Sequence, residues 1–224
     1  MKRGEKVALF DFCGTLANFQ TADPFVDYVR LHSKRFAVLF YKQLHRLLCL
    51  LRIIKILTDL FPQKSINKRI YALQLRGFSY KELDQMAYGY YLDIVRPNLI
   101  ERTLDELIRR QNEGWRIVIV SGGYDFYIKY FAMEYGIILK DIICTSFKFK
   151  DGICTGLFEG KDCLFTEKVN RLNNYMKEYQ RNSVAYSDSN SDTPFLSWAS
   201  VGYVVRNSQT ESWDADGLFE EIVV

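Results

Sequence analysis

The stretch VALFDFCGT, residues 7–15, decides the fold. Its first four residues, Val7 to Phe10, form an uninterrupted apolar run, which is typical of a strand buried on both faces of a parallel sheet. Asp11 follows directly, in a polar loop that contains Gly14. Ligands of open α/β sheets bind at the carboxyl ends of the strands, so Asp11 is a candidate for chemistry.

Three further apolar runs resemble the first. The run at 116–120 leads into Ser121, Gly122 and Gly123, and the run at 183–187 leads into Asp188 and Asp192. A weaker run covers residues 200–205. Amphipathic helical patterns separate the runs, so the sequence predicts an α/β fold with a Rossmann-like parallel sheet and right-handed crossovers.

A long helical segment interrupts this alternation. The eighty or so residues after the first strand read almost wholly as helix, which is too long for a crossover connection. We therefore expect an α/β core formed by residues 1–19 and 96–224, with a helical cap subdomain inserted at 20–95. Residues 144–158 instead predict a β-hairpin with Asp151-Gly152 as its turn.

Charge is distributed unevenly along the chain. The totals, 30 Lys and Arg against 27 Asp and Glu, give +3, which does not indicate a nucleic-acid partner. Between Arg30 and Arg69, however, the sequence has ten Lys and Arg residues and one acid. This segment therefore has a net charge of +9, and the rest of the chain has a net charge of −6. A solvated helix face explains such a segment in most proteins. The alternative is a surface for an anionic substrate or for peripheral contact with membrane headgroups, because apolar residues alternate with the cations.

Composition and cysteine content limit the classes of protein to which the chain can belong. With 48% hydrophobic and 25% charged residues, disordered and fibrous proteins are excluded. The five cysteines show no metal-ligand spacing, and no signal-peptide pattern opens the chain, so we expect a reduced, cytoplasmic protein. The most apolar stretch, 36–61, contains six charged or histidine residues and does not predict a membrane span.

Chemistry-bearing residues converge on one sheet edge. Asp11, Ser121, Asp188 and Asp192 all follow strands, and hard oxygen ligands suit Mg²⁺ while hydroxyls and backbone amides suit phosphoryl oxygens. A lysine would add the positive charge that phosphoryl transfer requires. Lys168 and Lys161 are both candidates, and Lys168 is favoured because it begins the helix that leads to the run at 183–187.

These motifs, in this order, resemble the haloacid dehalogenase superfamily of phosphohydrolases. The family's Asp-x-Asp-x-Thr motif matches residues 11–15 except at Cys13, and its Ser, Lys and acidic motifs match Ser121, Lys168 and residues 187–194. The helical insert and the sequence VSGGY at 120–124 are most similar to the phosphoserine-phosphatase-like branch.

The resemblance implies a Mg²⁺-dependent phosphomonoester hydrolase. Asp11 would be the nucleophile and form an aspartyl-phosphate, and Asp11, Asp188 and the carbonyl of Cys13 would hold Mg²⁺. The substrate would be a small phosphorylated metabolite or, in the alternative of a membrane-surface phosphatase that uses the basic insert, a lipid phosphate. The sequence does not identify it, nor the oligomeric state.

The same resemblance assigns supporting roles. Ser121 and the Gly122 amide would bind phosphoryl oxygens, and Lys168 would neutralise charge on the nucleophile and the phosphate. Asp192 would orient Lys168 or a metal-bound water. Thr15 would hold the first loop in shape.

Cys13 departs from the family pattern, because the family's acid/base Asp stands at this position. A thiol with a pKa near ~8.5 is mostly protonated at neutral pH and is a poor base. General acid–base catalysis typically contributes ~10²–10⁴-fold. Cys13 is therefore either a working thiol or an inert residue in the acid's place. The protein is accordingly a slow phosphatase or, alternatively, a catalytically weakened phosphate-binding regulatory protein.

Overall fold

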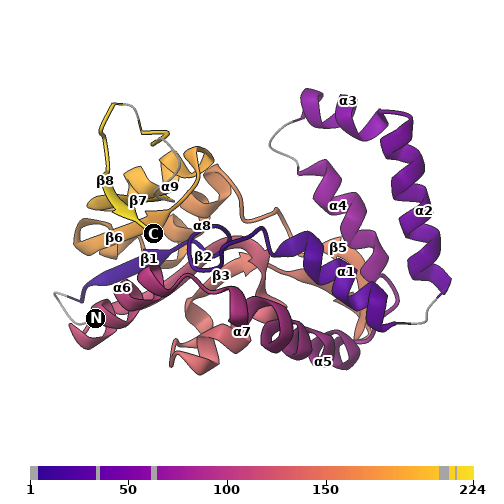
Figure 1. The fold of residues 1–224 in the computed structure, drawn as a ribbon, viewed down its shortest axis with the longest axis horizontal. Coiled ribbons are helices and arrows are strands. Elements are labelled where there is room, and N and C mark those ends of the chain that lie inside the picture. The colour runs from indigo at the N-terminus through magenta and orange to yellow at the C-terminus, as the bar shows by residue number, and fades with distance from the viewer. Residues whose placement is uncertain (1–4, 34–35, 62–64, 207–211, 215) are drawn as a thin grey trace.

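A six-stranded sheet forms the centre of the α/β core, beside which the helical insert lies (Figure 1). The computed structural model describes residues 5–33, 36–61, 65–206, 212–214 and 216–224. The strand order is β3-β2-β1-β6-β7-β8, and every neighbouring pair is parallel. This arrangement confirms the predicted α/β fold. The strands are β1 (Val7–Phe10), β2 (Arg116–Tyr124), β3 (Ile142–Thr145), β6 (Ser183–Ser187), β7 (Val201–Arg206) and β8 (Glu220–Val223).

Helices cover both faces of the sheet. Ala8 and Phe10 of β1 join one hydrophobic cluster, while Val7 and Leu9 join another. The first cluster includes side chains of α6 (Glu101–Asn112) and α7 (Asp125–Glu134), and the second includes side chains of α8 (Thr166–Met176) and α9 (Thr193–Trp198). Burial on both faces explains why β1 is apolar at every position.

The segment after β1 is helical, as expected. Its helices are α1 (Ala22–His32), α2 (Phe36–Leu50), α3 (Ile53–Leu60), α4 (Ile66–Ala72) and α5 (Tyr80–Tyr90), followed by a π-helical turn at Tyr91–Val95. They lie together beside one end of the sheet (Figure 1). Three of the ten predicted cations of the basic segment, Lys34, Arg35 and Lys64, lie outside the described residues.

The predicted β-hairpin is present and packs on this helical insert. Strands β4 (Phe147–Lys150) and β5 (Ile153–Phe158) are antiparallel and are joined by Asp151 and Gly152, whose φ angles of +49° and +74° suit a type I′ turn. Cys154 exchanges main-chain hydrogen bonds with the insert, donating to Phe78 O at 2.7 Å and accepting from Gly77 N at 2.9 Å. The hairpin is therefore attached to the insert as well as to the core.

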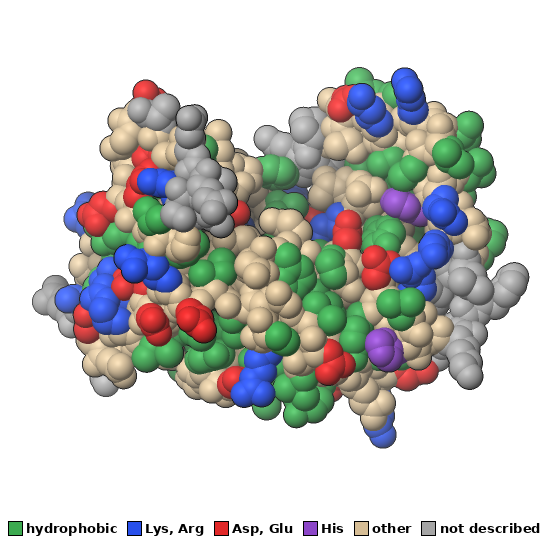
Figure 2. Space-filling model, in the orientation of Figure 1, with side chains coloured by type: hydrophobic (Ala, Val, Ile, Leu, Met, Phe, Trp, Pro, Cys, Tyr) green, Lys and Arg blue, Asp and Glu red, His purple; other side chains and the backbone are tan. Residues whose placement is uncertain are grey.

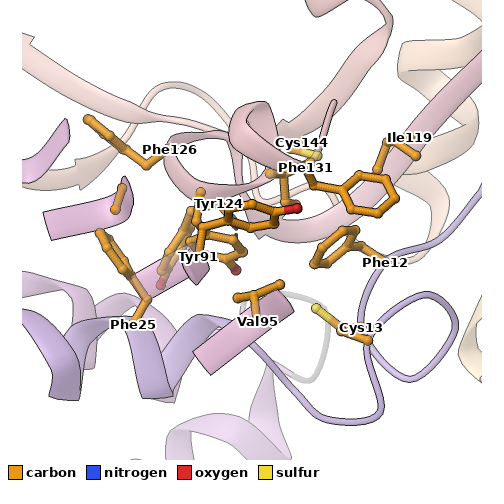
Figure 3. Packing of buried hydrophobic residues seen from close by; sticks show 14 of the residues in the cluster. Phe12, Cys13, Phe25, Tyr91, Val95, Ile119, Tyr124, Phe126, Phe131 and Cys144 are labelled. Atoms are coloured by element: carbon orange, nitrogen blue, oxygen red, sulfur yellow. Dashed lines mark hydrogen bonds between the residues drawn. The ribbon is translucent and has the colours of Figure 1, made fainter. Parts of the chain in front are cut away.

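Aromatic side chains join the insert to the core (Figure 3). The Phe25 ring of α1 lies 5.4 Å from the Tyr127 ring of α7. The Phe12 ring, from the loop after β1, packs edge-on against Phe131 at 5.2 Å. Cys13 lies at the border of this cluster, next to Phe12 (Figure 3). The loop that carries the candidate nucleophile is thus anchored through Phe12 on rings of α7, which Phe25 of the insert also contacts.

Some element boundaries differ from the prediction. Residues 144–145 belong to β3 of the main sheet rather than to the hairpin, and β2 continues through Tyr124 instead of ending at Val120. An irregularity in the β2–β3 register between Ser121 and Tyr124 accommodates the two glycines within the strand. Strand β8 was not predicted, because two acids occupy its four residues. Among the described residues, no helix has the length and apolarity that crossing a bilayer requires.

Candidate active site

The parallel register brings the ends of β1 and β6 together. Phe10 is paired with Tyr186, and the Asp11 amide continues the ladder by donating to Tyr186 O at 2.9 Å. Asp11 and Asp188 therefore leave adjacent strands at the same edge of the sheet. Both carboxylates line one small cavity of about 140 Å³.

The loop after β1 is fitted closely to Asp188. Gly14 has φ +80°, and a Cβ added there would lie only 2.1 Å from Asp188 Oδ2, so both the turn and the approach require glycine. The Thr15 hydroxyl donates to Asp188 Oδ1 and accepts from the Asp188 amide, each at 3.1 Å. Thr103 in turn donates to Thr15 O at 2.6 Å. Thr15 is fully buried, and its bonds are those of a residue that shapes the loop.

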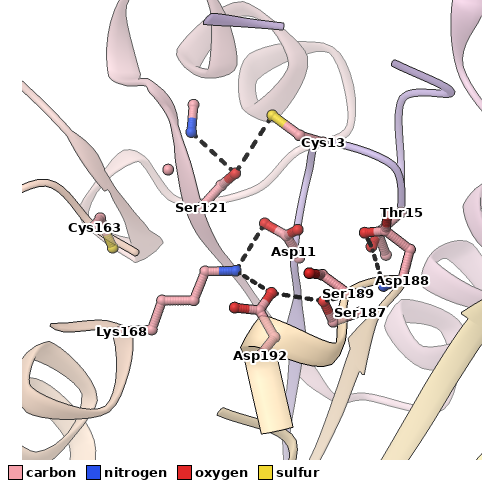
Figure 4. Close-up of polar contacts among 12 residues, drawn as sticks. Asp11, Cys13, Thr15, Ser121, Cys163, Lys168, Ser187, Asp188, Ser189 and Asp192 are labelled. Carbon is pink, nitrogen blue, oxygen red and sulfur yellow. Dashed lines mark hydrogen bonds and ion pairs between the residues drawn. The ribbon is translucent and has the colours of Figure 1, made fainter. Parts of the chain in front are cut away.

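Lys168 links two of the carboxylates (Figure 4). Its Nζ lies 3.0 Å from Asp11 Oδ1 and 2.5 Å from Asp192 Oδ2. Asp192 Oδ2 also accepts from Ser187 Oγ at 2.6 Å, so Ser187 fixes the carboxylate that contacts Lys168. This geometry favours orientation of Lys168 as the role of Asp192.

The alternative lysine lies elsewhere. The Lys161 side chain is 79% exposed, and its Nζ is 4.0 Å from Glu167 Oε2. It does not line the cavity that contains Asp11, whereas Lys168 does. The geometry therefore favours Lys168 over Lys161 as the cation of the site.

Burial and charge set the protonation of this cluster. The pKa of Asp11 is raised to about 6, chiefly by burial and in smaller part by the charges of Asp192 and Asp188, while the positive charge of Lys168 opposes the shift. Burial also raises the pKa of Asp188. For Lys168, burial alone would lower the pKa, but Asp11 and Asp192 outweigh it and raise the pKa above its usual value. Lys168 is thus positively charged throughout the physiological range.

Cys13 is held in a chain of buried polar groups. Its Sγ is 3.0 Å from Thr21 Oγ1, which is 2.6 Å from the Tyr127 hydroxyl. The Ser121 hydroxyl also donates to Cys13 Sγ at 3.9 Å (Figure 4). Burial, and secondly the charge of Asp11, raise the pKa of the thiol. Cys13 is therefore protonated at neutral pH and yields its proton with difficulty.

The predicted phosphate-binding residues differ in their access to the cavity. Gly122 lines it together with Gly123, whereas Ser121 is fully buried and is not part of the lining. The Ser121 hydroxyl accepts from Gly123 N at 3.1 Å in addition to its contact with Cys13. Ser121 thus lies directly behind the cavity wall, where it supports the two glycines.

Lys68 is a residue of this cavity that sequence reasoning did not single out. It belongs to α4 of the insert, and its Nζ donates to Gly122 O at 2.5 Å and to Asp162 Oδ1 at 2.7 Å. It lines the same cavity as Asp11 and Lys168. Its membership of the basic segment was a weak signal, because nothing local distinguishes it from its neighbours.

The residues present suit a divalent cation. Asp11, Asp188 and Asp192 supply three buried or partly buried carboxylates to the lining of the cavity, against the two ammonium groups of Lys168 and Lys68. Lys68 is itself paired with Asp162, which is not part of the lining. The excess negative charge and the hard oxygen donors are those that Mg²⁺ requires. Within the described ranges, no three His, Cys, Asp or Glu side chains cluster as a metal site.

Solved structures with the same fold extend over most of the chain. A protein of unknown function from Bordetella pertussis Tohama I is 22% identical, with a TM-score of 0.72 and coverage of 90% of each chain. A phosphoserine phosphatase, in a phospho-aspartyl intermediate analogue form, is 18% identical, with a TM-score of 0.58 and coverage of 91% of this chain and 87% of that one. Cytosolic 5'-nucleotidase IIIB is 13% identical, with a TM-score of 0.62 and coverage of 98% and 80%.

Sequence comparison points to the same group. No curated protein sequence matches the chain. The family model described as haloacid dehalogenase-like hydrolase, however, matches residues 8–197, which include Asp11, Ser121, Lys168 and Asp188. The match spans most of the chain and agrees with the resemblance of its motifs and with the fold. The chain therefore belongs to the haloacid dehalogenase-like hydrolase family.

Proposed function

We propose that this protein is a Mg²⁺-dependent phosphomonoester hydrolase that works through an aspartyl-phosphate on Asp11. One observation carries the proposal: Asp11 ends β1 in a small cavity and is paired there with a buried lysine, Lys168, at 3.0 Å. Family membership supports hydrolase chemistry, and the phosphoserine phosphatase fold supports a phosphate ester as the substrate.

The first half of the reaction transfers the phosphoryl group to Asp11. A carboxylate oxygen of Asp11 attacks phosphorus, the bond from phosphorus to the ester oxygen breaks, and the departing alkoxide takes up a proton. Lys168 favours the ionised form of Asp11 and offsets negative charge as it develops. The Gly122 amide would bind a phosphoryl oxygen, and Ser121, whose hydroxyl accepts from Gly123 N, would hold the following glycine in position. Lys68 adds a second positive charge at the cavity.

The second half returns the enzyme to its starting state. Water attacks the phosphorus of the aspartyl-phosphate, the acyl-phosphate bond breaks, and inorganic phosphate leaves the Asp11 carboxylate free. Asp11, Asp188 and the carbonyl of Cys13 would hold Mg²⁺, which supplies positive charge to the phosphoryl oxygens when it is bound. The five unpaired cysteines favour the cytoplasm as the site of the reaction.

Cys13 limits the proton transfers. Its raised pKa makes the thiol a weak acid toward the leaving oxygen, and a protonated thiol cannot accept a proton from water. Esters with stable leaving groups, such as aryl phosphates, need little help from an acid. We therefore expect aryl phosphates to be hydrolysed more readily than alkyl phosphates. The natural substrate would be a small phosphorylated metabolite or a lipid phosphate.

The raised pKa of Cys13 also favours a second candidate function, a phosphate-binding regulatory protein with little turnover. Phosphate release from an aryl phosphate, measured with Mg²⁺ and with EDTA, separates the two. The phosphatase should turn over only with Mg²⁺, and a denatured sample should carry phosphate that hydroxylamine removes. Binding of inorganic phosphate without turnover would support the regulatory protein instead. Full turnover by Asp11→Asn would exclude Asp11 as nucleophile.

A further inference from the structure

The turn between α2 and α3 exposes an unusual set of large apolar side chains. We call residues 46–56 the insert tip. Its exposed apolar side chains are Leu47 (52% exposed), Leu50 (81%), Leu51 (58%), Ile53 (36%) and Ile56 (56%). Single exposed leucines are ordinary, but five within eleven consecutive residues form a patch of the kind that marks an interaction surface.

Cations are interspersed with these apolar residues. Arg46, Arg52 and Lys55 are exposed, and no acid occurs between residues 46 and 56. Ile54 of α3 is buried, whereas Ile53 and Ile56 of the same helix are exposed, so among the described residues α3 packs on the insert by one side. Figure 2 shows green and blue side chains side by side on the lobe that α2 and α3 form. Leucines and isoleucines next to arginine and lysine are the pattern of helices that lie in a membrane interface.

We propose that the insert tip docks on the surface of an anionic lipid bilayer. The apolar side chains would enter the region between headgroups and acyl chains, and the cations would reach the lipid phosphates. The tip would lie on the bilayer and not cross it, which agrees with the short α2 and α3. This proposal concerns binding and does not depend on the proposed phosphatase activity.

A second copy of the chain is a less suitable occupant. A two-fold dimer through the tip would bring together two surfaces that each carry Arg46, Arg52 and Lys55, with Asp59 as the acid of α3 to offset them, so like charges would repel each other. An anionic bilayer instead offers negative charge to all three cations and an apolar layer to the leucines. The charge pattern therefore selects the bilayer.

Flotation with vesicles tests the proposal. The full chain should float with vesicles of phosphatidylcholine and phosphatidylglycerol, but not with phosphatidylcholine alone, and added salt should weaken the binding. Each cation near an anionic surface contributes about 1 kcal/mol, so Arg52→Glu/Lys55→Glu should weaken binding by at least about 30-fold. Leu50→Gln/Ile56→Gln should also weaken it, because apolar insertion is lost.

Matched variants on the core complete the test. Arg102→Glu/Lys140→Glu removes two exposed cations, and Met133→Gln/Ile138→Gln removes two exposed apolar side chains, away from the tip. Both should bind vesicles as the parent does, and all four variants should keep the parent's thermal unfolding midpoint.

Equal loss of binding in tip and core variants would overturn the proposal, as would no binding to anionic vesicles at low salt. A concentration-dependent dimer that the Leu50→Gln/Ile56→Gln variant dissociates would favour a second copy.

Discussion

Cys13 is the residue at which the first motif departs from the family pattern that it resembles. That pattern has an acid/base aspartate here, and the surroundings of the thiol do not make it an equivalent acid, because burial and Asp11 both raise its pKa. Its closest polar partners, Thr21 and Ser121, are hydroxyls that do not titrate in the physiological range. The thiol is therefore held by hydrogen bonds, and its surroundings do not make it a stronger acid.

Replacing Cys13 with aspartate should restore proton transfer. Because general acid–base catalysis contributes ~10²–10⁴-fold, we expect Cys13→Asp to raise kcat for an alkyl phosphate by about 10²-fold, the low end of that range. The gain should be smaller for p-nitrophenyl phosphate, whose phenolate leaves without a proton. Steady-state kinetics on both esters would measure the difference.

Cys13→Ala is the control for this experiment. If the thiol is inert, alanine should leave kcat for both esters close to the parent value. A parent enzyme already fast on alkyl phosphates, and slowed by Cys13→Asp, would contradict the prediction and show that another group transfers the proton.

Asp11 should make the metal-free protein less stable as the pH rises. Its pKa is about 6 in the folded protein against 3.8 for the unfolded chain, so between these values the folded protein binds the extra proton. The free energy of unfolding should then fall as the pH rises from about 4 to about 6, by at most about 3 kcal/mol. Protonation of Asp11 stabilises the protein fully below this window.

Urea unfolding in EDTA at several pH values would measure this contribution. Asp11→Asn cannot ionise, so its stability relative to the parent should increase as the pH rises through the window. Added Mg²⁺ should reduce the difference, because a cation favours the ionised carboxylate. A difference between parent and Asp11→Asn that does not vary with pH would refute the assignment.

At the scale of the elements, features that the local sequence pattern specifies could be predicted, and features that depend on tertiary packing could not. Asp11, Asp188 and Asp192 were predictable, because each follows a buried strand and parallel strands deliver their ends to one edge. Lys68 was not, because its place in the cavity depends on how α4 packs across the sheet end, which no local pattern specifies. Strand β8 was missed because its alternation is faint and its sequence acidic.

The position of α4 gives Lys68 a role in substrate binding. A hydrogen bond to a charged group contributes about 1.5–3 kcal/mol, so Lys68→Met should raise KM for a phosphate ester by about 10-fold with little change in kcat. The matched control is Lys161→Met, which removes an exposed lysine outside the cavity. Initial-rate kinetics would measure both constants.

A double variant separates this role from a structural one. Lys68→Met leaves the buried Asp162 carboxylate without its lysine partner, which destabilises the protein. Lys68→Met/Asp162→Asn removes that unpaired charge and should recover part of the lost stability, while KM stays high. Recovery of the parent KM in the double variant would mean that Lys68 only neutralises Asp162.

Across the whole molecule, the charges are separated between the insert and the core. Residues 30–69 carry +9 and the rest of the chain −6, and the carboxylates around the cavity add to the negative part. A phosphate ester approaching the core alone would be repelled, whereas the insert attracts it. We therefore expect kcat/KM to fall with added NaCl, because the screening length shortens from about 30 Å at 0.01 M to about 10 Å at 0.1 M.

Kinetics at constant Mg²⁺ and increasing NaCl would measure this dependence, and the change should lie in KM and not in kcat.

Arg46→Glu/Arg52→Glu should flatten the dependence of kcat/KM on NaCl, since it reverses charge on the insert. The core variant Arg102→Glu/Lys140→Glu changes the net charge equally and should flatten it less. An equal effect of both variants would mean that net charge, and not its position on the insert, attracts the substrate. A kcat/KM that does not vary with salt would show that the insert's charge does not act on the substrate at all.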